Sequence, residues 1–177
     1  MILAKKASPR LAAPPYIFTP VRTPTLYLDT SVLGGYFDDE WKVPTQELWK
    51  QREQGKYHFF TSLIAADELT EAPERVRELF AKTFAPEAVF DVTEEIEQLA
   101  SAYMAQAILT PKYSDDARHV AACTVAKIDY LVSWNFKHLV NIEREKGFNA
   151  VNLLHGYQSI RIVNPLELIY GSDDESL

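Results

Sequence analysis

The chain is poor in cysteine, in long apolar runs and in positive charge, and each shortage excludes a class of protein. Cys123 is the only cysteine among 177 residues, which excludes an intrachain disulfide and a cysteine-rich zinc site. No apolar run approaches the roughly 18 to 20 residues of a membrane-spanning helix, and the apolar start at residues 1–4 is too short for a signal peptide. We therefore expect a cytoplasmic protein with no membrane partner, in which Cys123 is a buried thiol of a helix.

Basic residues are also scarce. The chain has 18 lysines and arginines against 25 aspartates and glutamates, a net charge of −7. This excludes a protein that coats nucleic acid through bulk positive charge, so any contact with phosphate needs a local basic patch. Residues 1–23 contain basic but no acidic side chains, and the part of the chain that follows is therefore more acidic than the whole. We expect some of this acid to hold a cation.

The composition and length fit one folded domain, since 47% of the residues are hydrophobic and 177 residues can enclose a core. Residues 1–23 are rich in proline and show no sustained period, which predicts an extended N-terminal arm. We expect the folded domain to cover residues 24–170 and an acidic tail to cover residues 171–177. No internal repeat and no second domain is evident.

Within residues 24–170, short apolar runs alternate with segments of helical period. The runs that predict strands are residues 26–28, 57–61, 88–92, 130–133 and 159–163. The segments that predict helices are residues 32–37, 45–54, 62–69, 74–84, 93–107, 117–127 and 136–145, the last ending before Gly147, with a further turn at 152–157. Strands that alternate with helices favour an α/β fold, a three-layer α/β/α sandwich around a central, mainly parallel five-stranded sheet.

Four polar residues occupy equivalent places in this plan, near the carboxyl end of a strand or the amino end of a helix: Asp29, Glu68, Asp116 and Asn135. In a parallel sheet these ends share one edge, where ligands bind. Two carboxylates 4 Å apart repel by roughly 4 kcal/mol at an effective dielectric constant of 20, so a divalent cation would stabilise the group. Oxygen ligands suit Mg²⁺ or Mn²⁺.

Simpler roles remain open for several of these residues. Asp29 or Thr30 can cap the following helix, and the hydroxyls of Thr30 and Ser31 can instead orient a water. Asp115 competes with Asp116, but Asp116 shares a helical stripe with the apolar Val120, which favours Asp116 as the residue that faces the sheet edge.

The residues beside these acids suggest where phosphate or a base would bind. His119 and His138 are better explained as hydrogen-bonded helix histidines than as metal ligands. Together with Lys112, Arg118 and Lys137 they flank the acids in the sequence and can form the local basic patch. Trp134 can stack on a base, although packing against the sheet is its simpler role.

Four pieces of the sequence match motifs of a known family, in the family's order and across about residues 25–165. They are Leu28-Asp29-Thr30-Ser31-Val32-Leu33, then Thr61-Ser62 with Glu68-Leu69, then Asp116-Ala117-Arg118-His119-Val120-Ala121, and finally Leu131-Val132-Ser133-Trp134-Asn135-Phe136. On these pieces the chain resembles PIN-domain ribonucleases and, among them, the VapC-like toxins of type II toxin–antitoxin systems.

This resemblance implies a metal-dependent endoribonuclease in which Asp29, Glu68 and Asp116 hold Mg²⁺ or Mn²⁺ and Asn135 supports the site. It also implies an RNA substrate, an antitoxin partner and a homodimer. The family often has aspartate where this chain has Asn135, which lowers the charge of the site by one and leaves the number of metal ions open.

Two rival functions stay open. The first is a degenerate PIN domain that binds RNA or a protein partner without cleavage. The second is a phosphotransfer enzyme of haloacid-dehalogenase type, which also has aspartate at the end of its first strand. That class usually has a second aspartate two residues later, where this chain has Ser31.

Overall fold

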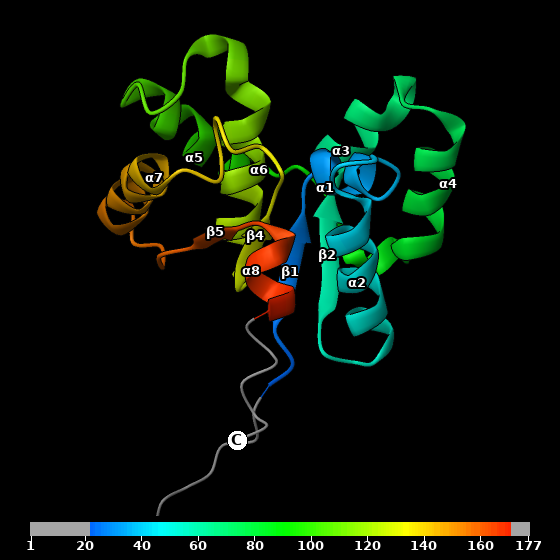
Figure 1. Cartoon of the computed structure of the whole chain (residues 1–177). Helices are drawn as coiled ribbons and strands as arrows, with labels where there is room; N and C mark the ends of the chain where they lie inside the picture. Colours follow the sequence, from blue (N-terminus) through cyan, green and yellow to red (C-terminus); the bar gives the residue numbers. More distant parts are fainter. Residues whose placement is uncertain (1–21, 171–177) are drawn as a thin grey trace, which may run out of the picture.

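The computed structural model describes residues 22–170, which fold as five strands separated by helices (Figure 1). The strands are β1 (Thr25–Leu28), β2 (His58–Ser62), β3 (Val89–Phe90), β4 (Tyr130–Val132) and β5 (Arg161–Val163). The α-helices are α1 (Thr30–Gly35), α2 (Lys42–Glu53), α3 (Leu63–Glu68), α4 (Glu74–Thr83), α5 (Glu94–Ala105), α6 (Ser114–Val125), α7 (Ile142–Leu154) and α8 (Pro165–Tyr170). Three 3-10 turns complete the described chain: η1 (Leu69–Glu71), η2 (Pro86–Ala88) and η3 (Pro111–Tyr113).

The five strands form one parallel sheet in the order β3-β2-β1-β4-β5. β1 is central, with Tyr27 paired with Phe60 of β2 and with Leu131 of β4. The chain adds β2 and β3 on one side of β1 and then crosses to add β4 and β5 on the other. The strand order therefore reverses between β1 and β4, and in open α/β sheets ligands bind beyond the carboxyl ends of the strands at such a point.

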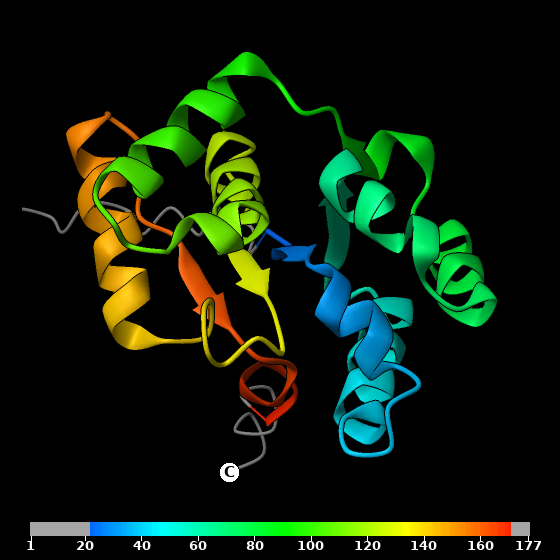
Figure 2. The ribbon, with the colours of Figure 1, turned by 90° about the horizontal axis from the view of Figure 1, so that it is seen from above.

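Alternation along β1 separates two apolar cores. Tyr27 packs with residues of α5, α6 and α7, whereas Leu26 and Leu28 pack with residues of α1, α2, α4 and α8. Figure 2 shows these two groups of helices on opposite sides of the sheet. The predicted three-layer α/β sandwich with a five-stranded parallel sheet is confirmed, and Cys123 is buried in α6 as expected.

Local capping explains several helix starts. Thr93 accepts a hydrogen bond from the Ile96 backbone N–H at 3.3 Å and so begins α5, as its sequence pattern predicts. Asp29 caps α1 through the Val32 N–H at 3.3 Å. Pro73 directly precedes α4, which begins at Glu74 as the predicted helix does.

The helix predicted at residues 136–145 is wrong over its first part and right over residues 142–145. Residues 136–139 form a turn, and α7 begins only after Asn141, whose side chain accepts from the N–H groups of Glu143 and Arg144 at 3.1 Å. α7 then continues through Gly147, where an added Cβ would lie 3.3 Å from the Ile108 side chain. Glycine at this position therefore allows close packing within a helix, and it does not end the helix.

Other boundaries differ by smaller amounts. The helix expected at 32–37 begins at Thr30, the strand expected at 88–92 is only Val89–Phe90, and α8 has no counterpart among the expected helices. Most of the predicted N-terminal arm and the acidic tail, residues 1–21 and 171–177, lie outside the described residues. Between residues 22 and 170 no helix is both long and apolar enough to cross a membrane.

Candidate functional site

Asp29 lies directly after β1 and is held almost wholly inside the protein, with 4% of its surface exposed. One carboxylate oxygen accepts from the Ser31 hydroxyl at 2.6 Å and from the Val32 N–H at 3.3 Å. The other accepts from the Ser133 hydroxyl at 2.5 Å, just after β4. Burial raises the pKa of Asp29, although these hydrogen bonds act in the opposite direction. Asp29 is therefore fixed at the point where the strand order reverses.

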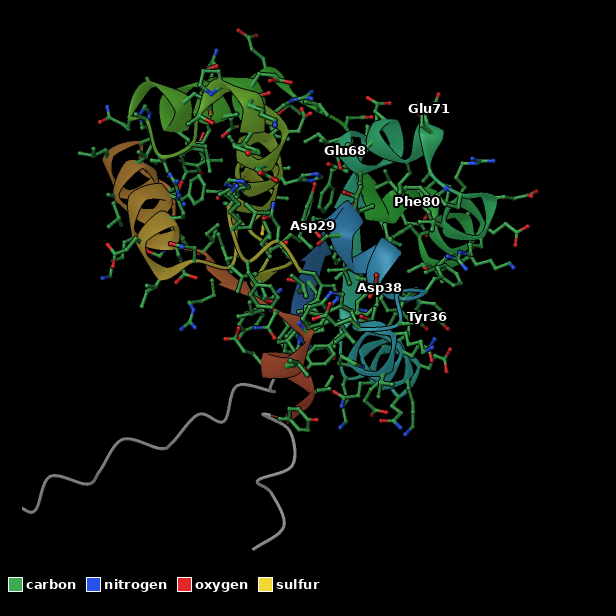
Figure 3. The ribbon with its side chains drawn as sticks, turned by 45° about the horizontal axis from the view of Figure 1, so that its top comes forward. Asp29, Tyr36, Asp38, Glu68, Glu71 and Phe80 are labelled. Carbon is green, nitrogen blue, oxygen red and sulfur yellow. The ribbon has the colours of Figure 1, made fainter. Side chains whose placement is uncertain are left out.

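Glu68 ends α3 and approaches the same edge from the side of β2. Figure 3 labels it near Asp29. Its Oε2 atom accepts from the Thr30 hydroxyl at 2.7 Å and lies 3.2 Å from His119 Nε2. Partial burial acts to raise the pKa of Glu68, but the hydrogen bond and charge of His119, with the Thr30 bond, outweigh it and lower the pKa.

A buried hydrogen-bonded chain supports His119. Its Nδ1 atom is 2.8 Å from the Tyr27 hydroxyl, which lies 2.6 Å from the Ser62 hydroxyl. His119 is 2% exposed and its ring meets Tyr27 edge-on, with ring centroids 5.7 Å apart. His119 is thus the hydrogen-bonded helix histidine that the sequence favours, and it connects the centre of the sheet to Glu68.

Asp116 faces the site from the first turn of α6. Its Oδ1 atom accepts from the Asn135 side-chain amide at 3.2 Å, and the Asn135 Oδ1 atom accepts from the His138 N–H at 3.1 Å. Burial and the charge of Asp29, with a smaller contribution from Glu68, raise the pKa of Asp116 to about 6. Asp115 points away to Arg118 at 3.2 Å with its side chain 57% exposed.

The three acids therefore influence one another without a strong basic neutraliser. Within residues 22–170, no lysine or arginine forms an ion pair with Asp29, Glu68 or Asp116, and the contact of Glu68 with His119 is the one ion pair of the group. In this same part of the chain, no three histidine, cysteine, aspartate or glutamate side chains are close enough to form a metal-binding group by themselves. The charges of Asp29 and Glu68 act on Asp116, but the three carboxylates do not converge on one point.

The two hydroxyls beside Asp29 bind protein groups at this edge. Thr30 is not the cap of α1, because Asp29 has that role and the Thr30 hydroxyl donates to Glu68. The Ser31 hydroxyl donates to Asp29 and accepts from the Trp134 N–H at 2.8 Å. Ser133 is a further residue whose hydroxyl binds Asp29, and the sequence does not identify it as a site residue. Its position directly after β4 is the only local feature that could have pointed to this role.

The predicted basic patch is only partly present. Arg118 is paired with Glu97 of α5 at 2.7 Å and with Asp115 of its own helix, so its charge is already compensated. Lys137 is exposed in the β4–α7 loop. His138 lies in this loop and not in a helix, and its ring stacks on Tyr113 with centroids 3.6 Å apart. Its Nδ1 atom is buried without a hydrogen-bond partner, so the expectation of a hydrogen-bonded helix histidine is wrong for His138.

Trp134 packs inside the protein, as its simpler role requires, and is 7% exposed. It stacks on Trp41 with ring centroids 4.4 Å apart, and its indole N–H donates to Thr45 at 3.0 Å. A Cβ at Gly35 would lie 2.7 Å from the Trp134 ring, so glycine is required for this close contact. Stacking on a base is therefore not available to Trp134 itself.

Comparisons with known proteins give little at the level of sequence. No protein-family model matches the chain, and no curated protein matches it in sequence. Among solved structures, the crystal structure of VapBC2 from Rickettsia felis bound to a DNA fragment from their promoter aligns with 79% of this chain and 98% of the other chain. The TM-score is 0.46 and the sequence identity is 11%. A similarity of this size does not establish a shared function.

Proposed function

We propose that this protein is a metal-dependent endoribonuclease of the VapC-like PIN type, which hydrolyses phosphodiester bonds of RNA at the carboxyl edge of its sheet. One observation carries the proposal. Asp29, Glu68 and Asp116 come from three separate parts of the chain, and the charges of Asp29 and Glu68 raise the pKa of Asp116 where the strand order reverses, with no lysine or arginine paired to the three acids in residues 22–170. A structural role would leave such repulsion unexplained, whereas a cation would relieve it.

The residues fit Mg²⁺ or Mn²⁺ by their chemistry. All three side chains offer carboxylate oxygens, and Mg²⁺ usually binds one or two protein carboxylates while keeping several waters. A site of this kind does not require three acids around one point, so the open arrangement of Asp29, Glu68 and Asp116 agrees with it. When bound, such an ion activates a water and stabilises charge on the phosphoryl group.

The protein's own groups would position the reacting partners. Ser31 and Ser133 hold both oxygens of Asp29, and the Asn135 amide holds one oxygen of Asp116. Because the pKa of Asp116 is raised to about 6, its second oxygen can exchange a proton near neutral pH in the metal-free protein. Asp29 would thus supply a carboxyl group held in place by three hydrogen bonds, and Asp116 one that gains or loses a proton near neutral pH.

The environment of Asp29 disfavours the phosphotransfer alternative. A phosphoaspartate enzyme needs an accessible nucleophilic oxygen on this residue. Here Asp29 is 4% exposed, and its two oxygens accept hydrogen bonds from Ser31, Val32 and Ser133.

The direct test is cleavage of a labelled single-stranded RNA with Mg²⁺ or Mn²⁺ and with chelator. We expect cleavage only with metal, and a loss of at least about a hundred-fold in kcat/KM for Asp116→Asn. Asp115→Asn is the matched control, since Asp115 lies on the same helical turn and points to Arg118. Cleavage in chelator, or loss of activity in the Asp115 variant alone, would contradict the proposal. Metal-independent RNA binding without cleavage in the wild type would support the degenerate PIN domain.

The toxin role extends the same proposal to a partner. A net charge of −7 suits a basic antitoxin segment that covers the acidic edge. We expect expression of the wild type to arrest growth and Asp116→Asn to relieve the arrest. Co-expression with the product of the adjacent small reading frame should yield a complex that survives purification. Absence of both effects would remove the toxin role without affecting the nuclease assignment.

A further inference from the structure

The β4–α7 loop, residues 133–141, contributes Phe136 to an aromatic surface and Lys137 to a positive surface, directly after Asn135. Phe136 follows Asn135 directly, and the Asn135 side chain accepts from the His138 N–H at 3.1 Å. The Asn135 amide also reaches Asp116 at 3.2 Å. Asn135 therefore connects both surfaces to the candidate site. Neither surface contains any of the three acids.

The aromatic surface is formed by Trp41 and Phe136. The Phe136 side chain is 43% exposed, with its ring centroid 5.7 Å from Trp41 and 6.0 Å from Trp134. Trp41 in turn stacks on the buried Trp134, which is anchored by its hydrogen bond to Thr45. A rigid, half-exposed ring beside an active centre suits the face of a nucleobase.

The positive surface is formed by Lys112, Lys137 and Arg144. Lys112 Nζ lies 5.8 Å from the Tyr113 ring centroid, and Tyr113 stacks on His138 at 3.6 Å. Besides burial, the charges of Lys137, Arg144 and Lys112 lower the pKa of His138, so all three act on the same ring. Lys137 directly precedes His138, and Arg144 lies in the first turn of α7 after the loop, so the three cations adjoin the Tyr113–His138 stack.

None of these three cations has an ion-pair partner within residues 22–170. The acids in the first turn of α7 form ion pairs with other residues: Glu143 with Lys146 at 2.9 Å and Glu145 with Arg161 at 3.5 Å. The positive surface is therefore available to an anion, in contrast to Arg118.

We propose that single-stranded RNA binds across the β4–α7 loop, with a base stacked on Phe136 against Trp41 and neighbouring phosphates on Lys112, Lys137 and Arg144. This inference rests on the proposed nuclease function and specifies which residues bind the RNA substrate. Single strands present unpaired base faces and a flexible backbone to such a combination of ring and cations, whereas a duplex stacks its bases inside. The scissile phosphate would then lie beside Asn135 and Asp116.

The aromatic contact is tested by binding of a short, fluorescently labelled oligouridine to the full chain in chelator, where cleavage does not interfere. We expect Phe136→Ala to raise Kd about ten-fold, a typical effect of losing one stacked base. Phe136→Trp should bind like the wild type, whereas Phe136→Leu should bind like the alanine variant. Leu154→Ala is the control, because it removes a side chain that is 82% exposed at the other end of α7.

The positive contact is tested by the salt dependence of the same binding. Each phosphate contact to a single strand contributes about 0.7 to the slope of log Kd against log salt concentration. The combined change of Lys112, Lys137 and Arg144 to glutamine should therefore lower that slope by about 2. Lys146→Gln should leave it unchanged, since Lys146 is already paired with Glu143.

The outcomes separate this inference from the nuclease assignment. An unchanged Kd for Phe136→Ala with an unchanged salt slope for the triple variant would overturn the inference, even if the wild type cleaves RNA. Equal affinity for a duplex would also overturn it, and so would equal binding by Phe136→Leu and Phe136→Trp, because the contact would then not depend on an aromatic ring. Loss of binding in these variants without any metal-dependent cleavage by the wild type would support the binding mode and contradict the nuclease.

Discussion

Asp129 and Asp116 lie at opposite edges of one parallel sheet, in surroundings of opposite character. Asp129, just before β4, accepts from Arg22 at 2.5 Å and from the N–H and hydroxyl of Thr25 at 2.7 Å. Asp116, at the carboxyl edge, accepts one bond from Asn135, and its pKa is raised by burial and by Asp29. The charge of Asp129 is compensated by Arg22, and its side chain binds Thr25 of β1. Asp116 is instead held near other acids that repel its charge.

This difference distinguishes a carboxylate that stabilises the fold from one that the fold merely tolerates. Removing a compensated acid breaks charge-assisted hydrogen bonds and leaves donors without partners. Removing an acid that is repelled by others relieves that repulsion. Proteins commonly accept such a stability cost at functional positions. The sign of the change in unfolding free energy on mutation therefore distinguishes a functional acid from a structural one.

The largest effect is expected at the compensated acid. Asp129→Ala should lower the free energy of unfolding by about 2–3 kcal/mol, because it removes the acceptor of two hydrogen bonds from Thr25 of β1 and of one from Arg22. Denaturant unfolding at pH 7 measures this change. Asp39→Ala should leave stability unchanged, since the Asp39 side chain is 96% exposed despite its 2.5 Å pair with Lys42. Equal stability of the two variants would contradict the structural role of Asp129.

A smaller effect of opposite sign is expected at Asp116. Its pKa rises from 3.8 when unfolded to about 6 when folded, so ionisation disfavours the folded state. Stability from this group is full below pH 3.8 and is lost as the pH rises through about 6. Asp116→Asn should therefore stabilise the metal-free protein by about 1–2 kcal/mol at pH 7.5, with the gain vanishing near pH 4. Unfolding curves in chelator at both pH values check this, and destabilisation at pH 7.5 would contradict it.

The carboxyl edge also shows how far local sequence patterns reach. The strand and helix periods predict the parallel sheet and this edge, and the apolar stripe of α6 is enough to distinguish Asp116 from Asp115. These features depend on patterns that repeat along the chain. Roles of Ser133 and Tyr27 depend on contacts across about one hundred residues, to Asp29 and His119, which no local pattern contains.

Two errors have part of their origin in common. A helix at residues 136–145 fits the local composition, yet Asn141 caps a later helix, and Gly147 packs inside it against Ile108. Arg118 resembles a free phosphate ligand in the sequence, but Glu97 on α5 neutralises it. The contacts of Gly147 and Arg118 are with residues distant in the sequence, whereas the Asn141 cap is a local signal that the helical period outweighed.

Added metal should affect the melting temperatures of the Asp116 and Asp129 variants differently. Mn²⁺ at ten times its dissociation constant should stabilise the wild type by about 1.4 kcal/mol, because a ligand stabilises the state that binds it. Thermal melting with Mn²⁺ and with chelator measures the shift. Asp116→Asn should abolish the shift, whereas Asp129→Ala should melt earlier but keep it. A shift of equal size in the Asp116 variant would show that Mn²⁺ binds elsewhere.

The smallest effect is expected at Glu68, which shares the edge with Asp116 but has the opposite pKa shift. Its pKa is lowered below 4.5 by His119 and Thr30, so its ionised form favours folding. This stability is present above pH 4.5 and is lost as the pH falls through the lower folded pKa. Glu68→Gln should therefore destabilise the metal-free protein at pH 7, and the difference should disappear in acid.

The Glu68 effect should amount to only a few tenths of a kcal/mol, because solvent screens a side chain that remains 29% exposed. Glu71→Gln is the matched control, as an exposed acid of the adjacent turn, η1, that Figure 3 labels beyond Glu68. Precise denaturant unfolding of both variants at pH 7 in chelator resolves the sign. If Glu68→Gln were to stabilise the protein as Asp116→Asn does, His119 would not compensate Glu68, and all three acids would form one repulsive cluster.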